Sequence, residues 1–382
     1  MTTSKPVWLQ SVSLWIILFL LHTPAYAQNH PFNITEVARF DEPWAMSFLP
    51  EGSLLITEKR GRLQHYTVDG AKTEISGVPE VAYSGQGGFG DIVLHPDFSR
   101  NELVYMSYAE PGESGRSGAA VARARLDLSR HALVDLQVIW RQSPKVRGSG
   151  HYGHRIAFDS NGYLFISSGE RQQFDPAQQM EKNLGKILRL NDDGSVPSDN
   201  PWVGSSEVTA QIWTSGHRNP LGLAFDENGR LWNVEMGPRG GDELNLVLRG
   251  ANYGYPEVSE GRHYSGLNIP DHVTRPQFNA PVISWNPVIS PSSLMFYSGA
   301  EFPDWQGNAF VGGLSSESLV RIEFDGIKAR EVQRFSMRAR IRAVTQGPDG
   351  GIWLLQDGNS GGRLLHLTAR DQGSTTTQRG EQ

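Results

Sequence analysis

The sequence predicts an all-β protein, a six-bladed β-propeller. Helical periodicity is nearly absent, and 42 glycines and 22 prolines interrupt short apolar runs, which is typical of strands joined by tight turns. One pattern, an apolar strand, a polar turn and a second apolar strand, occurs six times along the chain. Such repetition indicates blades arranged around an axis. A double-sheet sandwich is the alternative, but it does not require one hairpin pattern to recur along the whole chain.

The six hairpins follow one another from the first blade to the last. They cover residues 45–58, 91–108, 155–168, 222–235, 293–313 and 343–357. The intervals leave room for two further strands per blade, and apolar runs at 62–68, 120–128, 186–191 and 319–324 fit such strands. We expect residues 34–40 to complete the blade that holds residues 363–368, so that the N-terminal strand closes the ring.

Both ends of the chain are expected to lie outside the propeller. Residues 1–27 have the order of a secretory signal: Lys5, the apolar run VSLWIILFLL, and the small residues Ala25 and Ala27 at a cleavage site. The apolar run is shorter than the ~20 residues of a membrane span, so an uncleaved anchor is the weaker alternative. We therefore predict a periplasmic or secreted protein with a signal peptide at 1–27, a propeller at 28–369, a disordered tail at 370–382 and no membrane span in the mature chain.

The charge and the cysteine content restrict the classes of function. The chain has no cysteine, which excludes disulfides, thiolate metal ligands and cysteine nucleophiles. Its formal net charge is −6, and loss of Lys5 with the signal peptide makes it −7, which argues against nucleic acid or anionic lipid as a partner. Any cluster of basic residues therefore needs a local explanation.

The loops that lead into the first strand of each blade should meet on one rim of the ring. His151, Arg218 and Arg340 stand eleven positions before the turn glycines of their hairpins, Gly162, Gly229 and Gly351. The residues that we expect on this rim are Trp44, Gln86, His151, Arg218, Asn219, Trp285, Arg340 and Arg342. A base, cations, amides and aromatic rings together indicate a site for a planar anionic ligand. The alternative is that these loops are simply polar.

Two segments suggest particular ligands. In SMRARIRAV, the side chains of Arg338, Arg340 and Arg342 would point to one side of an extended strand, where they could bind carboxylates or form a solvated edge. MGPRGGDELN offers hard oxygen ligands, which could supply half of a Ca²⁺ site or belong to an ordinary glycine turn. The candidate calcium residues are Gly237, Pro238, Asp242, Glu243 and the nearby Tyr253.

Four long stretches resemble the glucose/sorbosone dehydrogenase family of quinoprotein sugar dehydrogenases, especially its aldose sugar dehydrogenase branch. They are SGQGGFGDIVLHPDF, SGHRNPLGLAFDENGRLW, GPRGGDELNLVLRGANYGYP and RIRAVTQGPDGGIW. The resemblance implies a six-bladed propeller that binds pyrroloquinoline quinone (PQQ) and Ca²⁺ and oxidises aldose sugars at C1 to lactones. It names neither the sugar nor the electron acceptor.

The resemblance also implies roles for the rim residues. His151 matches the family's base, Arg218 the arginine that polarises the quinone, and Gln86 and Asn219 its cofactor amides. Arg340 and Arg342 match the pair that binds carboxylates, and Trp285 approximately matches an aromatic residue near the cofactor. The carbonyls of Gly237 and Pro238 match the cofactor calcium site, with Asp242, Glu243 and Tyr253 at or beside it.

This chain departs from the family pattern at three positions. Ser315 stands where the family usually has lysine, Met236 where it has glutamine or histidine, and Gly150 where the glucose-specific branch has an acid. The missing lysine removes a cation, so weaker PQQ binding, or another acceptor and substrate, is an alternative. A calcium-dependent hydrolase such as a lactonase and a non-catalytic binding propeller are the alternative classes.

Of the two histidines in HYGH, we expect His151 to be the base and His154 to be structural. If the chain is already extended, His154 lies on the same side as Ile156 and Phe158 and packs against a neighbouring blade. We therefore expect a neutral, hydrogen-bonded His154, whereas His151 lies further out toward the rim.

Overall fold

The computed structural model describes Met1 and residues 30–370. The predicted signal peptide beyond Met1 and tail residues 371–382 lie outside the described residues. The propeller begins at Phe32. None of the helices in the described part of the chain is long and apolar enough to cross a membrane.

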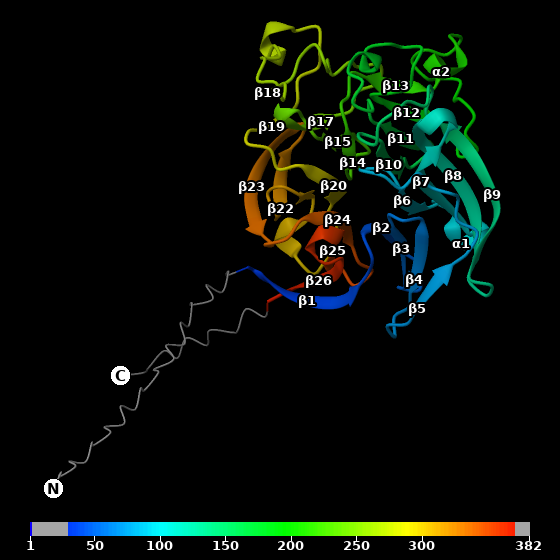
Figure 1. The fold of residues 1–382 in the computed structure, drawn as a ribbon, viewed down its shortest axis with the longest axis vertical. Coiled ribbons are helices and arrows are strands. Elements are labelled where there is room, and N and C mark those ends of the chain that lie inside the picture. The colour runs from blue at the N-terminus through cyan, green and yellow to red at the C-terminus, as the bar shows by residue number, and fades with distance from the viewer. Residues whose placement is uncertain (2–29, 371–382) are drawn as a thin grey trace. The chain divides into compact units, whose positions relative to one another are not determined.

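Six four-stranded antiparallel sheets surround a common axis (Figure 1). Blade 1 contains β2 (Pro43–Phe48), β3 (Leu54–Glu58), β4 (Arg62–Tyr66) and β5 (Lys72–Ile75), and blade 2 contains β6 (Phe89–Leu94), β7 (Leu103–Pro111), β8 (Ser117–Asp127) and β9 (Ala132–Arg141). Blade 3 contains β10 (Gly153–Phe158), β11 (Leu164–Ser168), β12 (Lys186–Leu190) and β13 (Ile212–Ser215), and blade 4 contains β14 (Pro220–Phe225), β15 (Leu231–Glu235), β17 (Asp242–Leu246) and β19 (Ile283–Trp285). Blade 5 contains β20 (Pro291–Phe296), β21 (Ala309–Gly313), β22 (Ser318–Asp325) and β23 (Lys328–Ser336), and blade 6 contains β24 (Ile341–Gln346), β25 (Ile352–Gln356), β26 (Arg363–Ala369) and β1 (Phe32–Arg39).

The first strands of consecutive blades lie beside one another and form a closed ring. Contacts run from β2 through β6, β10, β14, β20 and β24, and from β24 back to β2. The N-terminal strand β1 pairs antiparallel with β26, with Ile34 opposite Leu367. The predicted six-bladed propeller, its six hairpins and the closing strand are therefore confirmed.

Short elements lie between the strands. The helices α1 (Phe98–Asn101) and α2 (Glu207–Ala210) are single turns, and β16 (Arg239–Gly240) pairs with β18 (Gly261–Arg262) in a small separate sheet. The 3₁₀ turns are η1 (Glu113–Gly115), η2 (Asp175–Ala177), η3 (His272–Thr274), η4 (Pro303–Trp305) and η5 (Gly358–Ser360).

Local sequence explains the tight turns of the hairpins. Between β10 and β11, the Asp159 carboxylate accepts backbone hydrogen bonds from Asn161 and Tyr163, each at 2.9 Å. The turn closes at Gly162, whose φ of +83° is a conformation that glycine adopts without steric cost. The DENG turn of the next blade uses Asp226 in the same way.

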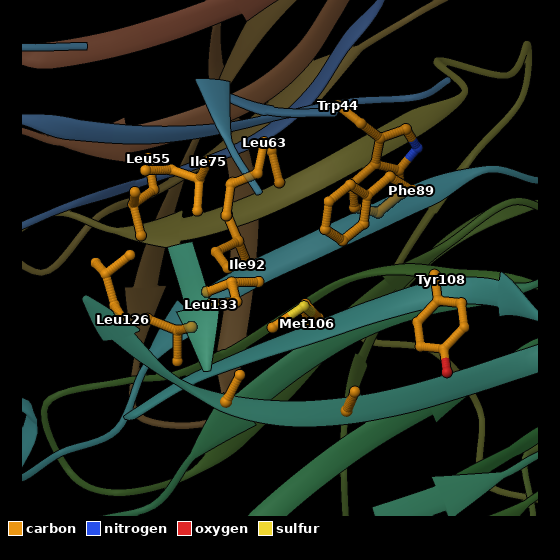
Figure 2. Packing of buried hydrophobic residues seen from close by; sticks show 14 of the residues in the cluster. Trp44, Leu55, Leu63, Ile75, Phe89, Ile92, Met106, Tyr108, Leu126 and Leu133 are labelled. Atoms are coloured by element: carbon orange, nitrogen blue, oxygen red, sulfur yellow. The ribbon is translucent and has the colours of Figure 1, made fainter. Parts of the chain in front are cut away.

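Apolar side chains pack between adjacent blades. Figure 2 shows one such cluster, in which Leu55 and Leu63 of blade 1 pack with Ile92 and Met106 of blade 2. All four are almost completely buried. Because burial of each such side chain contributes about 1.5–3 kcal/mol, contacts of this kind hold the blades together and keep the rim loops in place.

Candidate active site

Three adjacent cavities lie where the chain enters the first strands of the blades. The inner cavity, of about 350 Å³, is lined by residues that include Trp44, Lys59, Gln86, His154, Arg340 and Arg342. The outer cavity, of about 640 Å³, shares Gln86 and adds His151, Arg218, Gly237, Pro238 and Asp242. The side cavity, of about 280 Å³, lies against the same His151 and Arg218 and is walled by Phe174, Tyr255 and Tyr264. Loops from several blades thus converge on one region, as the propeller predicts.

His151 is held on both its backbone and its ring. Its backbone N–H donates to the Gln86 amide oxygen at 2.8 Å, and its φ is +50°. Its Nδ1 is hydrogen-bonded to the carboxylate of Glu170, which follows β11 and is fully buried. A carboxylate on Nδ1 fixes the tautomer in which Nδ1 carries the proton, so Nε2 is the nitrogen that can accept one.

The pKa values of this pair favour a neutral imidazole beside an ionised carboxylate. Burial lowers the pKa of His151, the charge of Arg218 lowers it further, and the bond to Glu170 opposes both. Burial alone would raise the pKa of Glu170, but the bond from His151, the backbone N–H of Phe174 and the charge of Arg218 bring it below its usual value. His151 can therefore act as a general base near neutral pH.

Arg218 lies between the outer and side cavities. One terminal nitrogen donates to the carbonyls of Met236 at 3.0 Å and Gly237 at 2.7 Å. The guanidinium carbon is 5.9 Å from the ring centres of both Tyr255 and Tyr264. Arg218 thus brings a fixed positive charge to the cavity that also contains His151.

The expected arginine pair is present in the inner cavity. Arg342 Nε donates to the Asp357 carboxylate at 3.1 Å, and a terminal nitrogen of Arg340 lies 3.7 Å from the same carboxylate. Burial would raise the pKa of Asp357, but the charge of Arg342 holds it below its usual value. Arg338 has a φ of +51° and precedes β24, so it does not continue the alternation, and only Arg340 and Arg342 line the cavity.

Several donors at this site have no acceptor. Within residues 30–370, the buried Arg218 Nε, Asn219 Nδ2 and Arg340 Nε make no hydrogen bond. The other atom of the Asn219 amide, Oδ1, accepts from the backbone of Gly153 at 3.2 Å. A buried donor without a partner costs about 1–3 kcal/mol, so these three donors fit a ligand rich in oxygen acceptors.

The candidate calcium residues divide into two groups. Gly237, Pro238 and Asp242 line the outer cavity. The Asp242 carboxylate is already occupied, since it accepts backbone hydrogen bonds from Gly237, Ile289 and Ser290 at 2.7–2.9 Å. Burial raises its pKa to about 6. Asp242 therefore holds the loop that presents the Gly237 and Pro238 carbonyls.

Glu243 lies on β17 and Tyr253 in the loop that follows it, and neither residue lines the three cavities. Glu243 accepts from Asn245 at 3.2 Å, and burial together with the nearby Glu235 raises its pKa well above the usual value. The Tyr253 ring stacks on His217 with the ring centres 4.7 Å apart. Among the described residues, no three His, Asp or Glu side chains gather as a metal cluster.

A sequence model of the family described as Glucose / Sorbosone dehydrogenase matches residues 40–366. The chain belongs to this family. It is therefore an enzyme of the sugar dehydrogenase type, and the resemblance seen in its sequence is confirmed.

Relatives of this dehydrogenase cover nearly all of the propeller. Aldose sugar dehydrogenase YliI of Escherichia coli (strain K12) is 40% identical over 342 residues, which cover 87% of this chain and 91% of that protein. The structure of the soluble aldose sugar dehydrogenase from Escherichia coli in the apo-form has a TM-score of 0.84 at 38% identity, with 89% of this chain and 100% of that chain covered. The PQQ-bound form of aldose sugar dehydrogenase from Streptomyces coelicolor has a TM-score of 0.74 at 29% identity, with 89% and 98% covered.

Two positions of the dehydrogenase differ from the sequence expectation. Trp285 ends β19, the outermost strand of blade 4, where its indole N–H donates to Glu331 at 2.7 Å and its ring packs in the apolar core. It lines none of the three cavities, because residues 286–290, and not Trp285, lead into β20. The left-handed glycine of the last turn is Gly350, so Arg340 stands one residue off the register that we expected from Gly351.

His154 also differs from the expectation. Its φ is +77°, and the pairing of β10 with β11 is irregular between Gly153 and Ile156, so the assumed alternation does not apply. Burial, with the charges of Arg171 and Arg155, lowers its pKa to about 3, in agreement with a neutral ring. In residues 30–370, however, neither ring nitrogen has a hydrogen-bond partner, so the expected hydrogen-bonded state is not observed.

Sequence reasoning missed Glu170, the partner of the base. The sequence contained a hint, because Glu170 comes two residues after the second strand of blade 3 and Glu235 ends the second strand of blade 4, where it binds the ring of His217 at 2.9 Å. A histidine before the first strand and a glutamate at or just after the end of the second strand thus recur in adjacent blades. The aromatic wall of the side cavity was also missed, because its residues come from irregular loops.

Proposed function

We propose that this enzyme is a PQQ- and Ca²⁺-dependent aldose dehydrogenase that oxidises sugars at C1 to the lactone. The observation that carries the proposal is the set of buried donors on Arg218, Asn219 and Arg340 that lack an acceptor beside a neutral, carboxylate-paired His151. An anionic, oxygen-rich ligand would satisfy those donors. The PQQ-bound relative supports PQQ as that ligand.

The residues present fit both cofactors by their chemistry. Arg340 and Arg342 would bind carboxylates, with Gln86 and Asn219 as amide contacts. The carbonyls of Gly237 and Pro238 would supply two of the ~6–8 oxygens that Ca²⁺ prefers, and the cofactor and water would supply others. We assign Asp242 the positioning of these carbonyls. We give Glu243 and Tyr253 no part in this rim site, because both are buried and neither lines its cavities.

When bound, PQQ supplies a quinone that accepts a hydride from the sugar. The chain's own residues move the proton. His151 Nε2 takes the proton from the anomeric hydroxyl, and Glu170 stabilises the imidazolium that results. Arg218 stabilises negative charge that develops nearby. A positioned general base contributes about 10²–10⁴-fold to the rate.

The side cavity is the place that we propose for the sugar. Its volume of about 280 Å³ and its aromatic wall suit a pyranose ring, whose C–H face packs on aromatic side chains. Phe174 is fixed there because its backbone N–H donates to Glu170 at 2.8 Å. The carboxylate that orients the base thus also orients part of this wall.

The experiment is dye reduction by purified protein, measured over a panel of aldoses with and without PQQ and Ca²⁺. We expect dye reduction only when both PQQ and Ca²⁺ are present, and we expect it to stop when a calcium chelator is added. No turnover with any aldose, together with hydrolysis of lactones, would instead support a calcium-dependent hydrolase.

We also propose that the protein is exported and cleaved after Ala27, because small residues occupy the positions that signal peptidase reads. Mass spectrometry of a periplasmic or secreted fraction should give an N-terminus at Gln28. An intact N-terminus there would contradict this.

A further inference from the structure

His154 is held in a conformation that histidine rarely adopts. Its φ of +77° lies in the left-handed region, which glycine adopts freely but which crowds the Cβ of other residues. Its carbonyl accepts the Ser107 hydroxyl at 2.6 Å, which helps to hold the backbone. A residue kept in such a conformation is a reason to look for a function of its side chain.

The ring of His154 is buried between aromatic side chains and a glycine. It stacks on Tyr152 with the ring centres 5.2 Å apart and meets Trp44 edge to face at 5.7 Å. A Cβ added to Gly90 of β6 would come within 2.7 Å of its Cγ, so the absence of a side chain there leaves room for the ring. The position of the ring is thus set by contacts with Tyr152, Trp44 and Gly90.

The polar atoms of this ring are unsatisfied. His154 is only 3% exposed, and within the described residues both of its nitrogens lack a hydrogen-bond partner. A neutral imidazole has one donor and one acceptor, and leaving both unpaired in a buried place is unfavourable. Packing alone therefore does not explain why an imidazole, and not an apolar ring, occupies this site.

The surroundings of His154 favour an anion. His154 is one of the residues that line the inner cavity, together with Lys59, Arg340 and Arg342. The charges of Arg171 and Arg155 also act on its ring, as does that of Lys59. Asp357 and Glu42 line the same cavity, but Asp357 is already paired with Arg342. The ring therefore faces a region rich in positive charge, where a carboxylate is the acceptor that electrostatics favours.

We propose that His154 is a further ligand-binding residue of the inner cavity, whose imidazole N–H donates a hydrogen bond to a carboxylate group of PQQ. The inference rests on the proposed function, because it takes PQQ as the ligand. It assigns to His154 a task distinct from that of His151: His154 binds the cofactor, and His151 accepts a proton from the sugar. The bound carboxylate would supply the partner that the ring lacks.

The test compares variants in PQQ affinity and in the stability of the cofactor-free protein. His154→Gly removes the ring and relaxes the left-handed backbone, so we expect PQQ to bind about 10- to 100-fold more weakly, the value of one charge-assisted hydrogen bond. The relaxed backbone offsets part of the packing lost with the ring, so we expect the cofactor-free variant to remain folded. His154→Asn keeps an N–H donor and tolerates a positive φ, so we expect an intermediate affinity. Fluorescence quenching by PQQ in the presence of Ca²⁺ measures the Kd without turnover.

His65 is the matched control. It is also buried and also has an unpartnered ring nitrogen, but it lies on β4 and lines none of the three cavities. His65→Ala should leave the Kd for PQQ unchanged.

Two results would overturn the inference, and they differ from failure of the proposed function. A His154→Gly protein that binds PQQ within twofold of wild type would show that the ring makes no contact with it. If that variant does not fold, a folded His154→Phe protein, which keeps an aromatic ring but has no N–H donor, with affinity equal to wild type would contradict a donor role. If wild-type protein binds no PQQ, the proposed function itself fails.

Discussion

Replacement of Arg155 with methionine should test how the ring of blades is closed around its axis. Arg155 lies on β10, and its guanidinium contacts the first strand of each of the other five blades. Its partners are the Asp91 carboxylate at 3.1 Å, the Leu221 carbonyl at 2.6 Å, the Ser292 carbonyl, the Arg342 carbonyl at 3.5 Å and the Trp44 ring at 4.1 Å. Methionine has a similar length and no charge, so the change removes these bonds and keeps most of the volume.

The expected loss of stability follows from the burial of this pair. Arg155 and Asp91 are each less than a tenth exposed, and removal of one partner from a buried ion pair typically costs about 3–5 kcal/mol. With an unfolding entropy of about 2 cal/mol/K per residue in a domain of this length, that loss lowers the Tm by about 4–7 °C.

The pH dependence of this loss has a definite sign. Burial raises the pKa of Asp91 above its ordinary value even with Arg155 present. Without Arg155, the folded state disfavours ionised Asp91 still more, so the loss is largest at neutral pH and shrinks as the pH falls toward the pKa of an unfolded aspartate, about 3.9.

Thermal unfolding followed by circular dichroism at several pH values is the assay. Arg100→Met is the control, because Arg100 pairs with Asp97 on the surface and should change the Tm by less than about 1 °C. The double variant with Asp91→Asn should recover part of the loss. A Tm for Arg155→Met within 1 °C of wild type, or a loss that grows at low pH, would refute this account of ring closure.

The remaining predictions concern the rim. Glu170→Gln should lower kcat by about 10²-fold with PQQ still bound, because the amide does not stabilise the imidazolium of His151 as the carboxylate does. Stopped-flow reduction measures the rate, and a decrease of less than threefold would argue against this role of Glu170. Because the pKa of His151 is lowered, the acidic limb of the kcat/KM profile should have its midpoint below 6.5, and a midpoint above 7 would contradict a neutral buried base. The Ser315 hydroxyl lies 2.8 Å from that of Ser290, which lines the inner and outer cavities. Ser315→Lys should therefore tighten PQQ binding about two- to fivefold. A titration with unchanged or weaker affinity would show that residue 315 does not face the cofactor.

The repeated hairpin pattern made the fold predictable from the sequence. An apolar strand, a polar turn and a second strand are local features, and six copies leave few arrangements other than a ring of blades. The rim position of His151, Arg218 and the arginine pair followed from the same repeat, because equivalent loops of a propeller meet on one face. The family motifs then suggested a chemical task for each of them.

What the sequence did not reveal depends on irregular backbone. The positive φ values of Gly153 (+78°) and His154 (+77°) and a break in strand pairing change which way the His154 ring points, and no alternation rule describes them. Trp285 was misplaced because it ends β19, the outermost strand of blade 4, and the loop that leads into β20 begins only after it. Glu170 was missed because its role depends on a contact with His151 and not on a motif.

Single-turnover reduction in PQQ- and Ca²⁺-loaded protein, with wild type and His151→Ala compared at saturating aldose, tests directly whether His151 is the base. We expect the variant to bind PQQ with wild-type affinity and its reduction rate to fall by at least ~10²-fold, because the general base is lost. A variant that reduces at a rate within a few fold of wild type, with PQQ fully bound, would contradict the assignment of His151 as the base and the mechanism built on it.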